Sequence, residues 1–471
     1  MSADRPPRVT LPDEVAVVNV GLPRFAEALR DQAVPVQQLD WRIPAAGDPE
    51  AVGALERLYG ERADGIDRAN AEVVRRLDQG VPSLVGIGPA EGLVPDLTGR
   101  VLLHCGPEID WPDVCDPLRR SMRAATVAEG WAADVDEADR LLATGAVRLE
   151  PGYLHDVVLP MASSMGPSVP VFEVGNAAGG TRAFAPVNQG PGETAWFGME
   201  TPAAIERLAF LRDVAGPLLR EVLHRAGPVE LFALAAQGVQ MGDDVHMRTQ
   251  GTTNLLLRDL LPHLVALPDD RRVDLARFLS GNHLFFLNLA MAAAKSVALW
   301  AEQVEGSSIV TLMCRNGTDY GIRLAGSSRM FLAEAPPVEH GMYYPDHGPE
   351  SGAHDIGDSA ILELVGLGGA AAAGSPAVAG FLGGRMADAA AVTEEMALVC
   401  AGESSRFKLA TRDFAGTPLG VDARRVVELD ITPSVTTGIL HVSSGEGQIG
   451  AGVASAPVAC FRAAVLDLAG I

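Results

Sequence analysis

The densest run of polar side chains that could do chemistry reads QGVQMGDDVHMR. Asp243 and His246 are three residues apart, so a helix would place both on one face, where a carboxylate can hold one imidazole tautomer as a general base. Asp244 and Arg248 would pair in the same way at a spacing of four. The alternative is structural: one aspartate caps a helix that begins at Val245, and Asp244 and Arg248 form a surface ion pair.

A second polar cluster reads CRNGTDYG. Arg315 offers a bidentate fork for phosphate or carboxylate, Asn316 offers an amide that could polarise a carbonyl, and Gly317 lets the backbone approach a ligand. The alternative is an ordinary hairpin turn, because Asn-Gly is the strongest short hairpin signal. Cys314 is expected to be a buried small residue rather than a nucleophile.

A third cluster lies within DIGDSAILELVGLGGAAAAGSP. Asp358 and Ser359 are predicted to cap an apolar helix, and Gly366, Gly368 and Gly369 to open another helix whose free amides suit an anion. The run lacks the Gly-Lys-Ser/Thr ending of a P-loop, so it is no ATPase signature. Close helix packing through glycine and alanine is the alternative interpretation.

Three histidines, His340, His347 and His354, follow one another at intervals of seven in a predicted loop. Seven-residue spacing in a loop has no fixed geometry, so solvated histidines are expected there and we predict neither a metal nor a cofactor. Lys295 interrupts the most apolar predicted helix and could serve as a cation for the substrate.

The composition narrows the classes of partner. The chain has 471 residues with 60 Asp+Glu against 37 Lys+Arg, a formal charge of −23, which repels nucleic acid and anionic membranes. The five cysteines form no Cys-x-x-Cys pair, and the N-terminal residues lack the apolar core of a signal peptide. These features predict a cytoplasmic enzyme with a small anionic substrate. The 51 glycines favour the loops of an α/β fold.

The elements that must position these residues alternate between apolar and amphipathic stretches. We predict an α/β fold in which N-terminal Rossmann-like βαβ modules precede a helix-rich α+β domain with glycine-rich loops. The expected domains are residues 1–45, 46–190 and 191–471. Three long helices are expected at 201–226, 245–265 and 270–304. A hairpin is expected from Ser307 to Gly326 and a loop at 335–358.

Taken together, the clusters resemble the YlbE-like family, also known as the AllG-type subunit of oxamate carbamoyltransferase and long labelled a domain of unknown function. The N-terminal segment, which ends in QLDWRIPAAGD, is similar to part of FdrA-type subunits, whose fold is like that of succinyl-CoA synthetase. The resemblance covers residues 100 to 465 and rests on seven ordered motifs, LLHCGP, AEGWA, AQGVQMGDDVHMR, FFLNLAMA, SIVTLMCRNGTDYGIR, GDSAI and GQIGAG with PVACF.

The resemblance implies a carbamoyltransferase system of allantoin breakdown, in which an FdrA-type chain, a YlbE-like chain and a third chain phosphorolyse oxalurate to oxamate and carbamoyl phosphate. Other complex subunits or a homo-oligomer are therefore expected partners. From the chemistry of the residues, and not from the family, we assign phosphate binding to Arg315 and Arg248 and proton transfer to His246. The alternatives are a non-catalytic scaffold or ligand-binding subunit of an FdrA-type complex, and a ligase-like protein dependent on CoA or a nucleotide.

Overall fold

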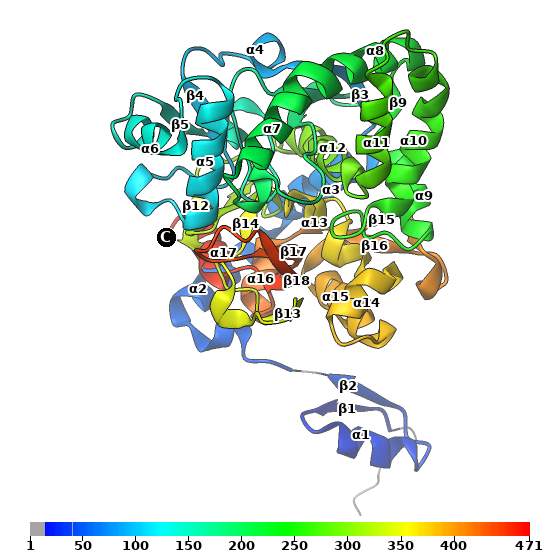
Figure 1. The fold of residues 1–471 in the computed structure, drawn as a ribbon. Helices are drawn as coiled ribbons and strands as arrows, with labels where there is room; N and C mark the ends of the chain where they lie inside the picture. Colours follow the sequence, from blue (N-terminus) through cyan, green and yellow to red (C-terminus); the bar gives the residue numbers. More distant parts are fainter. Residues whose placement is uncertain (1–14, 40) are drawn as a thin grey trace, which may run out of the picture.

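A computed structural model of the chain describes residues 15–39 and 41–471. Its first elements form a small unit that lies apart from the rest of the molecule (Figure 1): strand β1 (Val17–Val20), helix α1 (Pro23–Arg30) and strand β2 (Val36–Leu39). The two strands pair in parallel, as the predicted βαβ pattern requires. Phe25 and Trp41 are 61% and 62% exposed, and Ala26 is the buried residue of α1. Two strands bury too little surface to form a stable core by themselves.

Helices α2 (Pro49–Tyr59) and α3 (Ala63–Gln79) belong to the main body. Asp48 caps α2 through the amides of Glu50 and Ala51, and its carboxylate also pairs with Arg462 of α17 (Val458–Ala469). Leu58 of α2 is fully buried. The body therefore begins just before α2, close to the predicted boundary at residue 45, although the division into three domains remains a prediction.

Mixed helix and sheet make up the body, and the predicted α/β class is confirmed. One four-stranded sheet has the order β8-β7-β3-β9, and a three-stranded sheet has the order β5-β4-β6. Strand β9 comes from beyond residue 191 and pairs with β3, so this sheet joins segments from both sides of the predicted boundary at residue 190. The elements are β3 (Pro82–Pro89), α4 (Ala90–Leu93), β4 (Val101–His104), α5 (Asp116–Ala128), α6 (Val135–Ala143), β5 (Arg148–Pro151), β6 (Ser164–Met165), β7 (Pro170–Asn176), β8 (Thr181–Pro186) and β9 (Val229–Glu230).

The middle of the chain is helical, as its three- and four-residue apolar spacing predicts. The predicted helix 201–226 is present, with a π turn at Leu211–Ala215 inside it. Two other expectations are wrong in detail: the helix predicted from 245 begins at Gln250, and the one predicted over 270–304 breaks at residues 282–284. The elements are α7 (Pro202–Phe210), α8 (Gly216–Ala226), α9 (Leu231–Gln240), α10 (Gln250–Val265), α11 (Arg272–Gly281) and α12 (Phe285–Ala301).

The last third contains the predicted hairpin, β10 (Val310–Asn316) with β11 (Asp319–Leu324), in the sheet β12-β11-β10-β14. The predicted loop 335–358 is not wholly irregular, because β13 (His340–Tyr343) pairs with β18 in the sheet β13-β18-β17. The other elements are β12 (Phe331–Glu334), β14 (Ile356–Gly357), α13 (Ile361–Leu364), α14 (Pro376–Phe381), α15 (Met386–Val399), β15 (Cys400–Leu409), β16 (Ala415–Val421), α16 (Ala423–Leu429), β17 (Ser434–Leu440) and β18 (Gln448–Ser455).

Within residues 15–39 and 41–471, no single helix is long and apolar enough to cross a membrane. Helices α11 and α12 meet the length and composition test only as a pair, and they are bent by 80° at their junction.

Because the N-terminal unit lies apart from the body (Figure 1), we expect deletion of residues 1–39 to leave the thermal midpoint of the body within about 2 °C of the full chain. Differential scanning calorimetry measures this. Deletion through residue 80 is the control, because it removes the buried Leu58 and Leu77 and should prevent cooperative unfolding. A large loss of stability in the shorter deletion would show that the unit helps to hold the body together.

Candidate functional site

The loop between α9 and α10 carries Asp243 and His246, and it is not helical. Val245 has φ of 62°, a left-handed conformation that separates the two side chains and defeats the predicted shared helix face. The Asp243 carboxylate accepts from the amides of Gly251 and Thr252 and pairs with Arg248 at 2.6 Å. Asp243 therefore caps α10, and the prediction that it backs His246 is wrong.

The partner of His246 is Glu363, from helix α13. Nδ1 of His246 lies 2.8 Å from Oε1 of Glu363, and both side chains are buried, at 3% and 0% exposure. Among residues 15–39 and 41–471, no group hydrogen-bonds to Nε2 of His246. A carboxylate that accepts from Nδ1–H leaves Nε2 as the acceptor, which is the arrangement of a general base.

Besides His246, Oε1 of Glu363 accepts from donors on two other segments of the chain. The amides of Gly369 and Thr436 donate at 3.1 and 3.2 Å, and the Thr436 hydroxyl lies at 3.4 Å. The second oxygen, Oε2, is buried and has no partner in the part of the chain that the structure describes. The carboxylate is therefore fixed on one side and unsatisfied on the other.

Asp244 lies beside this pair and closes the loop. Its carboxylate accepts from the amides of Met247 and Arg248 at 3.1 and 2.7 Å and from the Thr436 hydroxyl at 3.1 Å. The predicted side-chain pair of Asp244 with Arg248 is wrong, because the Arg248 guanidinium binds Asp243 instead. Burial raises the pKa of Asp244, while the His246 ring and these hydrogen bonds oppose the rise.

The glycines of the third cluster allow the backbone to pack against this pair. Gly368 donates its amide to the Asp244 carbonyl at 2.7 Å, and a Cβ on Gly368 would lie 2.0 Å from Oε1 of Glu363. A Cβ on Gly369 would meet the Ser434 carbonyl at 2.1 Å. Both amides are used inside the protein, so the prediction that they are free for an anion is wrong. Gly366, with φ of 91°, turns the chain beside Thr417.

Arg315 is fully buried and is held by internal partners. Its guanidinium forks the Asp355 carboxylate at 2.8 and 2.9 Å and donates to the Gly357 carbonyl at 2.6 Å, while Thr437 donates to the same carboxylate at 3.0 Å. Burial opposes the charge of Arg315, but Asp355 outweighs it and raises the pKa of the arginine. The structure does not present Arg315 to a ligand, contrary to its predicted role as a phosphate fork.

Asn316 and Gly317 form the hairpin turn of the alternative interpretation. The Asn316 side chain accepts from the amides of Thr318 and Asp319 and donates to the Pro107 carbonyl. Gly317 has φ of 82°, which glycine adopts without strain. These contacts occupy Asn316, so the structure does not bring it to His246.

Asp358 and Ser359 precede α13 but do not cap it with their side chains, so that prediction is wrong. The Asp358 carboxylate accepts from the amides of Gly106 and Leu159 at 2.8 and 2.9 Å and ties two distant segments together. Burial raises the pKa of Asp358 to about 6 against these two hydrogen bonds.

Strand β17 connects the two charged groups of the site. Successive side chains of a strand point to opposite faces. Accordingly, Thr436 bonds Glu363 and Asp244 on one face, while Thr437 bonds Asp355 on the other. The 243–248 and 366–369 segments therefore meet directly, and Arg315 belongs to a separate pair across the strand.

Other predicted residues lie elsewhere. His347 packs edge-on to His441 at 5.7 Å between ring centroids. No group of three His, Cys, Asp or Glu side chains in the described ranges could hold a metal ion, so His340, His347 and His354 do not converge. Lys295 is fully buried, which lowers its pKa, and its ammonium has no hydrogen-bond partner among the described residues.

Comparison with known proteins identifies the family to which this chain belongs. A sequence model described as oxamate carbamoyltransferase subunit AllG matches residues 147–359. The chain is 37% identical to oxamate carbamoyltransferase subunit AllG of Escherichia coli (strain K12) over 409 residues, which covers 86% of this chain and 98% of that protein. The chain belongs to the AllG family. The predicted family is thus confirmed, whereas the FdrA-like character of the N-terminal unit remains a prediction.

Two further relatives of this AllG-family chain carry no assigned activity. The uncharacterized protein YahG of Escherichia coli (strain K12) is 33% identical over 453 residues, covering 96% of each chain. A crystal structure of a conserved protein of unknown function from Enterococcus faecalis V583 superposes with a TM-score of 0.84 at 34% identity, covering 86% of this chain and 98% of that one.

Four residues of the site were not predicted from the sequence: Glu363, Thr436, Thr437 and Asp355. Glu363 stands in the run SAILELVG, where an apolar helix interrupted by one acid is the only local signal. A charged residue inside an apolar helix must find a buried partner, and that rule could have singled it out.

Substitution of Gly369 by alanine tests the close packing at Glu363. The new Cβ would overlap the Ser434 carbonyl, and we expect the free energy of unfolding to fall by about 1–3 kcal/mol in chemical denaturation. Gly380→Ala in α14 is the matched control, because its Cβ would meet nothing within 4 Å, and a small gain is expected. Equal stability of both variants would contradict the packing described.

The raised pKa of Asp358 predicts a pH dependence of stability. The folded protein holds the proton of Asp358 up to a pKa of about 6, whereas the reference value is 3.8. The contribution of this group to the free energy of unfolding is therefore largest below pH 4 and is lost as the pH rises through 6. The loss attributable to this group is at most about 3 kcal/mol. Urea titrations from pH 4 to 7 should show the loss in the wild type and a flatter profile in Asp358→Asn, and parallel profiles would refute the assignment.

Proposed function

We propose that this chain is a subunit of a carbamoyl-transferring enzyme in which His246, oriented by Glu363, moves the proton. The reaction is the interconversion of a ureido acid such as oxalurate plus phosphate with carbamoyl phosphate plus oxamate. Membership of the AllG family supports the class, since its Escherichia coli relative is named a subunit of oxamate carbamoyltransferase. The observation that carries the proposal is the buried His246–Glu363 pair at 2.8 Å, in which Nε2 has no hydrogen bond to the described residues.

The reaction requires one proton to change places. A phosphate oxygen attacks the carbamoyl carbon of oxalurate, the bond from that carbon to the amide nitrogen breaks, and the nitrogen leaves as the amide of oxamate. Hydrogenphosphate loses its proton and the leaving nitrogen gains one, so charge and atoms balance. His246 can carry this proton on Nε2 as a general base and then as a general acid. Glu363 stabilises the imidazolium that forms between the two transfers.

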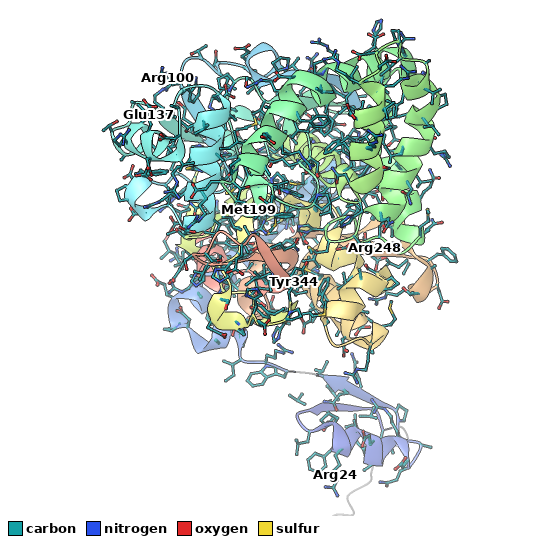
Figure 2. All side chains as sticks on the ribbon, in the orientation of Figure 1. Arg24, Arg100, Glu137, Met199, Arg248 and Tyr344 are labelled. Atoms are coloured by element: carbon teal, nitrogen blue, oxygen red, sulfur yellow. The ribbon has the colours of Figure 1, made fainter. Side chains whose placement is uncertain are left out.

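A candidate cation for the phosphate lies close to the histidine in the sequence. Arg248 is two residues from His246, and its side chain is 32% exposed although it contacts Asp243. Figure 2 shows Arg248 at the side of the body where the helices above meet α14 and α15. A half-neutralised guanidinium at the edge of the site is suited to an incoming dianion.

A second candidate function is a subunit whose partner holds the active site. Arg315 and the amides of Gly368 and Gly369 all bind groups of this protein. No complete phosphate cradle therefore stands open among the described residues around His246, and this observation favours a site completed by, or located in, another subunit. A partner is expected under both candidates.

Kinetics of oxalurate phosphorolysis distinguish the two candidates when they are measured on the complex assembled with this chain. We expect His246→Gln to lower kcat by about 100- to 10,000-fold, since a general acid–base contributes that much. Glu363→Gln should lower kcat at least about 10-fold because the imidazole loses its charged partner. Arg248→Gln should mainly raise the KM for phosphate, by about 10- to 100-fold.

His224→Gln on α8 is the matched control, because this histidine is exposed and lies outside the site, and its kinetics should equal those of the wild type. The thermal midpoint of each variant is measured in parallel. If folded His246→Gln and Glu363→Gln complexes turn over at the wild-type rate, proton transfer by this chain is excluded and the non-catalytic subunit is the better description.

A further inference from the structure

A cavity of about 400 Å³ opens between α7 and α11, away from the His246–Glu363 pair. Figure 1 shows both helices in the upper, helical part of the body. The cavity is lined by two arginines, two phenylalanine rings, a proline and a glycine, and none of these residues is acidic: Arg207, Arg277, Phe210, Phe278, Pro191 and Gly281. A cavity walled by two cations and no carboxylate is unexpected on a chain with a formal charge of −23.

Arg207 is the partly buried charged group that lines this cavity. It makes no ion pair with any carboxylate in residues 15–39 and 41–471, and its one hydrogen bond runs from NH1 to the Gln189 carbonyl at 2.9 Å. Nε and NH2 are left to bind a ligand. Burial without a counter-ion lowers the pKa of Arg207, although an arginine keeps its charge at neutral pH.

The rest of the wall suits a flat ligand. Phe210 and Phe278 meet edge to face at 5.5 Å between centroids, and the Arg207 guanidinium lies over the Phe278 ring at 5.5 Å. Arg277 stands at the rim, 76% exposed, with a 3.2 Å contact to Asp274 that is open to solvent and therefore weak. Asn282, which follows α11, keeps a buried Oδ1 without a partner among the described residues, and its amide lies close to Gly190 beside Arg207.

We propose that this cavity binds a small organic carboxylate with a flat, conjugated body. The carboxylate would accept from Nε and NH2 of Arg207 in a bidentate fork, and the flat body would lie against Phe210 and Phe278. The guanidinium fork and the aromatic walls favour a carboxylate on a planar group over inorganic phosphate, which has no apolar part to bury. The proposal does not rest on the reaction assigned to His246, and it holds whether or not this chain is catalytic.

Isothermal titration of the full chain with matched acids and amides tests the site. Benzoate and oxamate are the probes, and benzamide and oxamide are neutral probes of nearly the same shape. We expect both acids to bind at least 10-fold more tightly than their amides, and inorganic phosphate to compete weakly. If no acid binds at millimolar concentration, if the amides bind equally well, or if phosphate binds most tightly, the proposal fails.

Variants locate the binding in this cavity. We expect Arg207→Gln to weaken benzoate binding at least 10-fold, Arg207→Lys to weaken it less because the charge is kept, and Phe278→Leu to weaken benzoate more than oxamate. Arg258→Gln on α10, an exposed arginine paired with Asp259 outside this cavity, is the control and should bind as the wild type does. Thermal midpoints confirm folding, and wild-type binding by a folded Arg207→Gln protein would overturn the assignment.

Benzoate binding and turnover, measured on the same variants, separate this proposal from the proposed function. Arg207→Gln should lose benzoate binding, while His246→Gln should keep it. Loss of benzoate binding in His246→Gln would show that the carboxylate occupies the His246 site instead and would overturn the inference. Unchanged turnover in His246→Gln would refute the proposed proton transfer without affecting the carboxylate site.

Discussion

The burial of one carboxylate, Glu363, shapes the centre of this molecule. A buried carboxylate is tolerated only where donors surround it, because removing its charge from water costs several kcal/mol. Here the donors come from His246, Gly369 and Thr436, which lie on three different segments. The glycine at position 368 is required because any side chain would overlap the same oxygen. The loop, the glycine turn and the strand are thus each constrained by one group.

Strand β17 separates that carboxylate from a second buried charge. Thr436 faces Glu363, and Thr437 faces Asp355, which neutralises Arg315. Thr436 donates its amide to Glu363 and its hydroxyl to Asp244, and Thr437 donates its hydroxyl to Asp355 on the opposite face of the strand. Because the Asp355 pair is already neutral and hydrogen-bonded, it supports the strand. Among the described residues, by contrast, the Glu363 side retains a carboxylate oxygen without a partner and an imidazole Nε2 without a hydrogen bond. Chemistry is therefore expected on the Glu363 face only.

Local patterns in the sequence predicted local structure well and long-range pairing poorly. The Asn-Gly turn predicted the β10–β11 hairpin, and the apolar spacing predicted α7 and α8. The partner of His246 lies 117 residues away, and the amide of Thr436 is 73 residues from Glu363, so no spacing within one segment could reveal either contact. The prediction for Asp243 was wrong because an aspartate three residues before a histidine is equally typical of a helix face and of a helix cap. The left-handed backbone of Val245 excludes the helix, and the Asp243 carboxylate instead accepts from the first turn of α10.

In a chain with a formal charge of −23, the arginines that keep free donors are the best candidates for binding an anion. Arg315, Arg123 and Arg424 are each paired with carboxylates, so these buried or partly buried cations of the acidic chain are neutralised internally. Arg207 and Arg248 differ from these three because each keeps guanidinium donors without a hydrogen bond to the described residues. Arg248 is partly exposed beside Asp243, and Arg207 lies over the Phe278 ring without an ion pair among the described residues. Because the surrounding field is negative, each can attract an anion only at short range, where direct hydrogen bonds exceed the repulsion of the distant carboxylates.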